Sequence, residues 1–188
     1  MWFNMGNVRL YGATSGYTEL APPAVAPDGV LSLPSGTGTL LTAEGGKVLQ
    51  IVRATNATLS STTSTSFVDV TGMSVTITPT KATSTIIVQA YFSYSVVNTV
   101  TFNRLGYWQI TNSSNVALSG AEGVSDVGLI TGATYTVLNN MAISGFSSPA
   151  TTSATTYKLR FSVNAAGVTA NTINDRTTGQ MYAYEVSA

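Results

Sequence analysis

Four acidic residues are the side chains of this sequence best suited to acid–base chemistry. Hydrolysis of a glycosidic bond needs two carboxyl groups at a defined separation, but Asp69, Glu122, Asp126 and Asp175 are far apart in the sequence and mostly adjoin turn-forming residues. Glu122 and Asp126 share one predicted loop, residues 120–126, where they could bind Ca²⁺ with backbone carbonyls, although their spacing matches no EF-hand loop. We interpret all four as solvated loop acids.

Nucleophilic and phosphate chemistry lack the residues that they need. The chain contains many Ser and Thr but no His and no Cys, so no hydroxyl can be paired with an imidazole and no thiolate is present. The Gly-rich segments 12–16 and 36–38 are not followed by Lys-Ser or Lys-Thr and open no predicted helix, unlike phosphate-binding loops. We therefore predict no enzymatic activity, no catalytic or metal-ligating residue and no cofactor.

Charge is sparse and balanced along the chain. Eight basic and eight acidic residues make up 9% of the 188 residues, and the net charge is zero. Nucleic-acid-binding domains normally carry a basic excess, so we predict no nucleic-acid partner. No apolar run approaches the roughly 20 residues that cross a bilayer, and residues 1–6 lack the basic and apolar regions of a signal peptide. We expect neither membrane insertion nor signal-peptide secretion.

The elements that position these side chains are predicted to be β-strands. The clearest pattern covers residues 85–97, where apolar side chains alternate with a more polar set, as in a strand with one face in the core. The side chains predicted to face the core are Ile86, Val88, Ala90, Phe92, Tyr94 and Val96.

Further strand patterns are separated by turn-forming residues. They cover residues 47–53, 75–79, 104–110, 135–143, 157–163 and 180–186. We predict that the Ser/Thr-rich tract 54–66 is a loop with a strand near each end. No stretch has helical periodicity, and strand signals at intervals of roughly 10–25 residues predict an all-β fold, an antiparallel β-sandwich of the jelly-roll kind. A closed barrel fits less well because the intervals vary.

Aromatic side chains recur in or beside these strands. Tyr and Trp on a sheet surface can stack on sugar rings, and they are also favoured at protein interfaces. Tyr91, Ser93 and Ser95 lie on the more polar face of the strand at 85–97. We interpret these three residues as a subunit interface in preference to a ligand site.

Residues 1–45 are predicted to form an extended arm that precedes a β-sandwich at residues 46–188. Gly, Pro and other turn-forming residues interrupt this segment, so it cannot build a core of its own and needs a partner surface. Large apolar side chains are its candidate attachment residues. They are Trp2, Phe3, Met5, Tyr11, Tyr17, Leu20, Val25, Leu31, Leu33, Leu40 and Leu41.

Several long motifs resemble structural proteins of tailed bacteriophages, especially those of cyanobacteria and marine bacteria. In the arm they are Thr-Ser-Gly-Tyr-Thr-Glu-Leu (14–20), Pro-Ala-Val-Ala (23–26), Leu-Ser-Leu-Pro (31–34) and Gly-Thr-Gly-Thr-Leu-Leu-Thr (36–42). Residues 67–79 and 82–88 resemble the start of the β domain that follows the arm in such proteins, and residues 148–158 resemble a segment near its end.

The resemblance implies a homotrimeric β-sandwich on the outside of a virion. The first reading is a capsid decoration (cement) protein whose arms contact the major capsid protein and clamp neighbouring capsomers, with residues 91, 93 and 95 at the trimer interface. The alternative is the tip of a tail fibre or tailspike, attached to a tail or baseplate protein. Its predicted exposed loops, residues 98–103, 119–131 and 164–178, would bind a host-surface polysaccharide.

Overall fold

The computed structural model describes residues 8–11, 17–20, 47–101, 103–127 and 134–187. No helix long and apolar enough to cross a bilayer occurs in these ranges. Every strand pairing is antiparallel, which confirms the predicted all-β antiparallel fold. The strands are β1 (Val8–Tyr11), β2 (Tyr17–Leu20), β3 (Val48–Asn56), β4 (Leu59–Thr62), β5 (Val68–Ile77), β6 (Thr85–Asn98), β7 (Arg104–Asn112), β8 (Ala117–Val127), β9 (Tyr135–Ser147), β10 (Thr155–Val163), β11 (Val168–Ile173) and β12 (Gly179–Val186).

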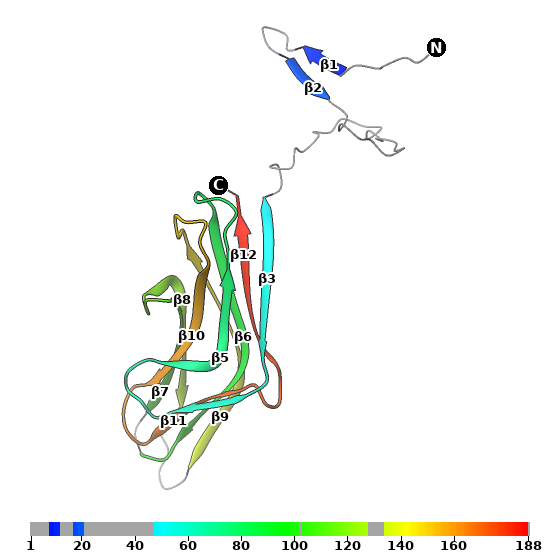
Figure 1. The fold of residues 1–188 in the computed structure, drawn as a ribbon. Helices are drawn as coiled ribbons and strands as arrows, with labels where there is room; N and C mark the ends of the chain where they lie inside the picture. The colour runs from blue at the N-terminus through cyan, green and yellow to red at the C-terminus, as the bar shows by residue number, and fades with distance from the viewer. Residues whose placement is uncertain (1–7, 12–16, 21–46, 102, 128–133, 188) are drawn as a thin grey trace. The chain divides into compact units, whose positions relative to one another are not determined.

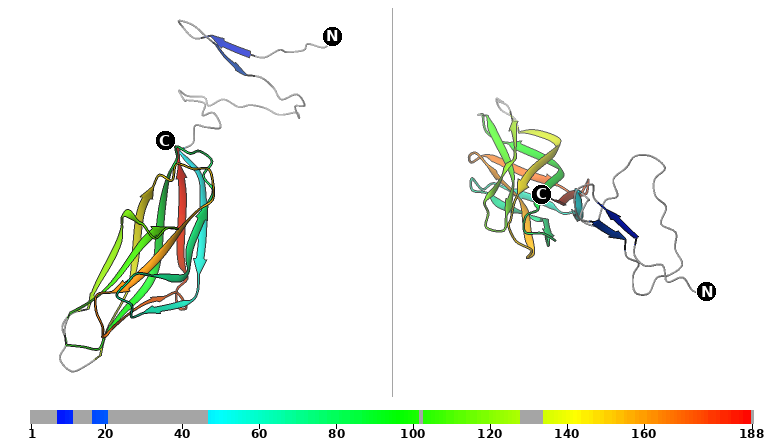
Figure 2. Two further views of the ribbon diagram at one scale, coloured as in Figure 1. Left: turned by 60° about the vertical axis from the view of Figure 1, so that its left-hand side comes forward. Right: turned by 90° about the horizontal axis from the view of Figure 1, so that it is seen from above.

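Strands β3 to β12 form two layers with jelly-roll connectivity. One layer has the order β3-β12-β6-β9 and the other β8-β7-β10-β5, and the two are joined at one edge by a single β9–β8 pair, Phe146 with Ser119. Strands β4 and β11 pair with each other, and β11 also pairs with β6. If β3 with β4 is counted as the first strand and β11 with β12 as the eighth, the chain pairs its first strand with its eighth, second with seventh, third with sixth and fourth with fifth. This nesting is the jelly roll, and the strands of both layers run lengthwise (Figures 1 and 2).

The core lies between the two layers. The inward residues of β6 are the predicted ones, and all six are buried. The Trp108 ring is almost fully buried and packs on Phe92 and Tyr94, with ring centroids 6.0 and 4.9 Å away. Each large apolar side chain buried in this way contributes about 1.5–3 kcal/mol.

The Ser/Thr-rich tract contains more strand than the sequence predicts. β3 continues to Asn56, and β4 occupies the middle of the expected loop. β11 provides the pairing partner, with Ala170 opposite Thr62 and Ile173 opposite Leu59. Thr suits a pleated surface, and a polar tract becomes a strand here because a neighbouring strand satisfies its backbone.

Two segments that the sequence predicts as loops contain strands in the structure, so these two predictions are wrong. Residues 120–126 lie in β8, and the predicted exposed segment 164–178 contains β11, which is largely buried. In β8 the middle of the core-facing side is small, with Ala121 and Ser125 between Leu118 and Val127, and the positive φ of 75° at Gly120 accompanies a register shift that breaks the alternation. Both features conceal a strand from a search for large alternating apolar side chains.

Residues 1–40 and 41–188 are separate compact units. In the first, β1 and β2 form a two-stranded antiparallel ribbon, with Val8 opposite Leu20 and Tyr11 opposite Tyr17. A two-stranded ribbon alone is marginally stable in water. Tyr11, Tyr17 and Leu20 lie in these strands. Trp2, Phe3, Met5, Val25, Leu31, Leu33, Leu40 and Leu41 lie outside the described residues.

Candidate functional site

The four acids do not form a catalytic pair. Across one layer, Asp69, Arg160, Gln109 and Glu122 occupy successive strands in register, which separates the backbones of the two acids by about 14 Å. Glu122 and Asp126 are four residues apart along β8, or about 13 Å. Carboxyl pairs in glycosidases are closer, at about 5–9.5 Å.

The acids also form no metal cluster. No group of three or more Asp, Glu, His or Cys residues that could hold a metal ion occurs within the described part of the chain. Asp175 lies in the connection between β11 and β12, in the other layer from Asp69, Glu122 and Asp126. Glu122 and Asp126 are exposed, as predicted for solvated acids, although they lie on a strand and not on a loop.

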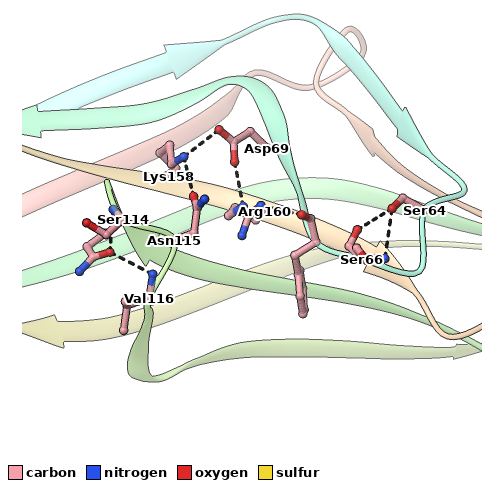
Figure 3. Close-up of polar contacts among 10 residues, drawn as sticks. Ser64, Ser66, Asp69, Ser114, Asn115, Val116, Lys158 and Arg160 are labelled. Carbon is pink, nitrogen blue, oxygen red and sulfur yellow. Dashed lines mark hydrogen bonds and ion pairs between the residues drawn. The ribbon is translucent and has the colours of Figure 1, made fainter.

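Asp69 belongs to an ion-pair cluster on the outer face of the β8-β7-β10-β5 layer (Figure 3). Lys158 Nζ donates to Asp69 Oδ2 at 2.9 Å and to Asn115 Oδ1 at 2.8 Å, and Arg160 Nε donates to Asp69 Oδ1 at 2.8 Å. Burial raises the pKa of the Asp69 carboxyl, but hydrogen bonds and charge from Lys158 and Arg160 outweigh it and hold this pKa below its ordinary value. The Arg160 guanidinium also donates to the Phe67 carbonyl at 2.6 Å.

A hollow of about 570 Å³ lies on the same layer, and we call it the β7–β8 hollow. Outward side chains of β7 and β8 form its floor in two cross-strand pairs, Tyr107 with Val124 and Gln109 with Glu122. Phe67, just before β5, adds a second aromatic side chain to the lining. The hollow is therefore mainly apolar, with one amide and one carboxylate.

The outer face of the other layer carries a row of apolar side chains across four strands. Neighbours in the row are cross-strand partners, which run in the order Phe146, Ile87, Tyr184 and Ile51 from β9 to β3. Phe146 is 60% exposed and Ile51 is 58% exposed. A row of this kind leaves large apolar side chains in contact with water at both ends.

Tyrosine rings extend this row. Tyr182 stacks on Tyr184 at 5.9 Å with an interplanar angle of 18°, and it meets Tyr91 edge to face at 6.1 Å. The Arg53 guanidinium lies 5.9 Å from the Tyr182 ring centroid, within range of a cation–π contact. We call this surface the aromatic face, made of Ile51, Ile87, Tyr91, Phe146, Tyr182 and Tyr184.

The three residues predicted at the trimer interface have different surroundings. Tyr91 is exposed and belongs to the aromatic face. Ser93 is half-buried and donates to Asn140 Oδ1 at 2.6 Å. Ser95 is 6% exposed and accepts a hydrogen bond from Asn171 Nδ2 at 3.0 Å. The surface that β6 offers to a partner therefore centres on Tyr91, and Ser95 is already covered by its own chain.

Glu185 is a buried carboxylate that the sequence search for functional acids missed. Its side chain is fully buried, and its oxygens accept from Gln50 Nε2 at 2.7 Å, the Thr80 amide at 2.7 Å and the Lys81 amide at 3.1 Å. Burial raises the pKa of Glu185, but these hydrogen bonds outweigh it and lower the pKa to about 2. The period-two pattern of residues 180–186 could have revealed it, because Glu185 shares the phase of buried Met181 and Ala183.

Glu185 ties together the end of the sandwich at which the N-terminal segment enters. Gln50 is on β3, while Thr80 and Lys81 belong to the turn between β5 and β6. At the same end, the Ser187 amide donates to the Lys47 carbonyl at 2.8 Å. The entry strand, the β5–β6 turn and the C-terminal strand are thus connected by a short hydrogen-bond network.

Comparison with known proteins adds little. No protein-family model and no curated protein matches this sequence. Similar solved structures include the T13 viral particle of infectious bursal disease virus (17% identity, TM-score 0.34, 92% of this chain and 42% of that chain). They also include the Gt strain of that virus (18% identity, TM-score 0.30, 95% of this chain and 46% of that chain). A third is its VP2 subviral particle (18% identity, TM-score 0.30, 94% of this chain and 45% of that chain). This chain spans less than half the length of the chains it matches, and TM-scores this low carry no inference about function.

Proposed function

We propose that this chain is a structural protein of a tailed-phage virion that assembles through its aromatic face as a homotrimer. Residues 1–45 attach the trimer to the major capsid protein, so that it decorates the outside of the head and clamps neighbouring capsomers. The observation that carries the proposal is the aromatic face, where large apolar side chains line up across four strands and leave Phe146 60% and Ile51 58% exposed. The motif resemblance and the jelly-roll fold, which recurs in capsid proteins, support the virion setting.

The composition of the aromatic face favours burial against a protein. Aromatic side chains carry about 150–250 Å² each, so its partly exposed rings and isoleucines present a patch of a few hundred Å², the size at which apolar patches mark interaction sites. Arg53 is the one charged side chain that β3, β12, β6 and β9 turn outward. Burying this face therefore removes few charges from water.

Assembly is tested by placing charges on the aromatic face. We expect wild-type protein to be a trimer at micromolar concentration in light scattering and native mass spectrometry, and the double variant Ile51→Lys, Phe146→Lys to be a folded monomer. Val124→Lys is the matched control, because Val124 is also 60% exposed but lies on the other layer. A monomeric wild type, or a double variant that stays trimeric, contradicts the proposed interface.

Capsid attachment is tested by deleting residues 1–45. The truncated protein should keep its trimeric state and circular dichroism spectrum but lose binding to undecorated capsids, because many shallow contacts per trimer supply the avidity. Truncated protein that occupies capsids as fully as wild type in electron-microscopy maps would show that residues 1–45 are not the clamp.

The second candidate function is a tail-fibre tip that binds a host-surface polysaccharide. One observation favours it: the β6–β7 and β10–β11 connections lie at the end of the sandwich opposite the entry of β3, where a tip would meet the host (Figure 1). Purified trimer at micromolar concentration should then block phage adsorption. An electron-microscopy map that locates the chain on the particle distinguishes the head from the tail.

A further inference from the structure

The β7–β8 hollow has an unusual polar feature on its floor. Gln109 is only 9% exposed, and it makes no side-chain hydrogen bond within residues 47–101, 103–127 and 134–187, but its amide atoms are not among the buried ones and remain open to the hollow. Water can satisfy this amide in the free protein, and a ligand in the hollow can take the place of that water by hydrogen bonding to it. The Gln109 amide can therefore donate to and accept from a ligand that carries hydroxyl groups.

The charges around the hollow exclude an anionic ligand. Glu122 lines it and lies opposite Gln109 in the strand register. On the other side of Gln109 the register places Arg160, whose guanidinium is turned to Asp69 (Figure 3) and also donates to the Phe67 carbonyl. An anion entering the hollow would thus meet a carboxylate, while the neighbouring cation is already bound.

The remaining lining of the hollow is apolar. Tyr107 and Phe67 are both half-buried and contribute aromatic rings, and Val124 is exposed beside Tyr107. A volume of about 570 Å³ falls within the range of small-molecule sites. The occupant therefore needs an apolar surface for the rings and hydroxyl groups for Gln109 and Glu122.

A pyranose ring combines these properties, and we propose that the β7–β8 hollow binds a neutral saccharide residue. The C–H face of the sugar packs on Tyr107, with Phe67 beside it. Sugar hydroxyls donate to the Glu122 carboxylate and exchange hydrogen bonds with the Gln109 amide. The proposal does not depend on the assembly proposed above, because the aromatic face is on the other layer.

Trp108 allows the binding to be measured on the full chain. Its backbone borders the hollow between Tyr107 and Gln109 while its ring lies in the core beneath, and the other tryptophan, Trp2, can be replaced in a Trp2→Phe background. The probes are methyl β-D-glucopyranoside, methyl β-D-galactopyranoside and N-acetylglucosamine, followed by tryptophan fluorescence and saturation-transfer NMR. We expect saturable binding of at least one sugar at about millimolar concentration, as for a ligand of this size in an open site.

Variants separate this site from unspecific binding. Tyr107→Ala should weaken sugar binding at least about tenfold, a loss typical of removing one stacked ring. Tyr135→Ala is the matched control, because Tyr135 is 48% exposed but lies at the start of β9. Glu122→Gln should weaken the binding of the neutral sugar severalfold, because a hydrogen-bond acceptor is lost. The same variant should bind glucuronate better, relative to the neutral sugar, than wild type does, because the repelling charge is gone. This second variant changes one exposed side chain and so remains informative if Tyr107→Ala fails to fold.

Three results would overturn the saccharide site. The first is no saturable signal with any of the three sugars at 100-fold excess over about 1 mM. The second is tighter binding of tetramethylammonium than of the sugars, which would make the hollow a cation cage. The third is binding that is unchanged by both Tyr107→Ala and Glu122→Gln in folded protein.

Discussion

Replacing Glu185 with Gln should destabilise the jelly roll at neutral pH. One carboxylate oxygen accepts from the Thr80 amide, the Thr80 hydroxyl and the Lys81 amide at 2.7, 2.9 and 3.1 Å, and the other accepts from Gln50 Nε2 at 2.7 Å. A glutamine at this position has one oxygen and one NH₂ group, so its NH₂ must face another donor. The variant therefore loses the charge and at least one hydrogen bond in a buried site.

The magnitude and the pH dependence follow from the pKa of Glu185. Its pKa falls from 4.5 to about 2 in the folded protein, which at about 1.36 kcal/mol per unit corresponds to about 3 kcal/mol. We expect about 2 kcal/mol, because exposed Thr80 leaves the site close to solvent, which weakens the interaction. Since the folded pKa is lower than the unfolded one, the stabilisation is complete above pH 4.5 and is lost as the pH falls from 4.5 to 2.

The assay is urea unfolding of the full chain at pH 7 and pH 3, followed by the fluorescence of buried Trp108. At pH 7 we expect Glu185→Gln to lose about 2 kcal/mol, or about 4–8 °C in Tm, and at pH 3 we expect less than half of that difference. Glu122→Gln makes the same chemical change on an exposed strand position and should stay within about 0.5 kcal/mol of wild type.

Two outcomes would refute this reasoning about Glu185. One is a Glu185→Gln variant as stable as wild type at pH 7, which would mean that the donors gain nothing from the charge. The other is a difference that stays constant from pH 7 to pH 3, because a carboxylate with a lowered pKa must lose its advantage as it becomes protonated.

Two further predictions concern the backbone and the ion pairs. Gly72→Ala and Gly120→Ala introduce the same strain at positive φ (76° and 75°), but only at Gly72 does the new Cβ collide with a neighbour, the Asn56 amide. Chemical denaturation should show a loss of about 1–2 kcal/mol in unfolding free energy for Gly120→Ala and a larger loss for Gly72→Ala. Equal losses would contradict the collision. Asp69→Asn removes both ion pairs of a half-exposed carboxylate and should lower the unfolding free energy by less than about 1 kcal/mol at low salt. This difference should vanish in 1 M NaCl. A loss of stability that does not change with salt would show that Asp69 contributes through packing and not through its charge.

Much of the fold could be predicted from local patterns, because a strand with one buried face alternates strongly when its inward side chains are large. The six inward residues of β6 were identified in this way, and so was the strand nature of β10 and β12. β8 was missed because Ala121 and Ser125, which it turns inward, are small. β4 was missed because its polar residues become a strand only when β11 pairs with them.

The candidate sites depended on contacts between distant parts of the sequence. Ser95 shares a strand face with Tyr91 in the sequence pattern, but Asn171 covers it in the fold. The aromatic face and the β7–β8 hollow draw their residues from several strands that adjoin only after pairing. Nothing in the local sequence indicates which tyrosines will become neighbours.

Two kinds of information thus determined different properties of this protein. The sequence alone, through its inventory and its period-two patterns, predicted an antiparallel β protein without His or Cys, since composition and alternation are local properties. Only the tertiary structure decided that Glu185 is a buried, hydrogen-bonded anion and that Gln109 lines a hollow with Tyr107 and Glu122. Burial and hydrogen bonding depend on residues far apart in the sequence, such as Gln50 and Glu185, which are 135 positions apart and become neighbours only when β3 pairs with β12.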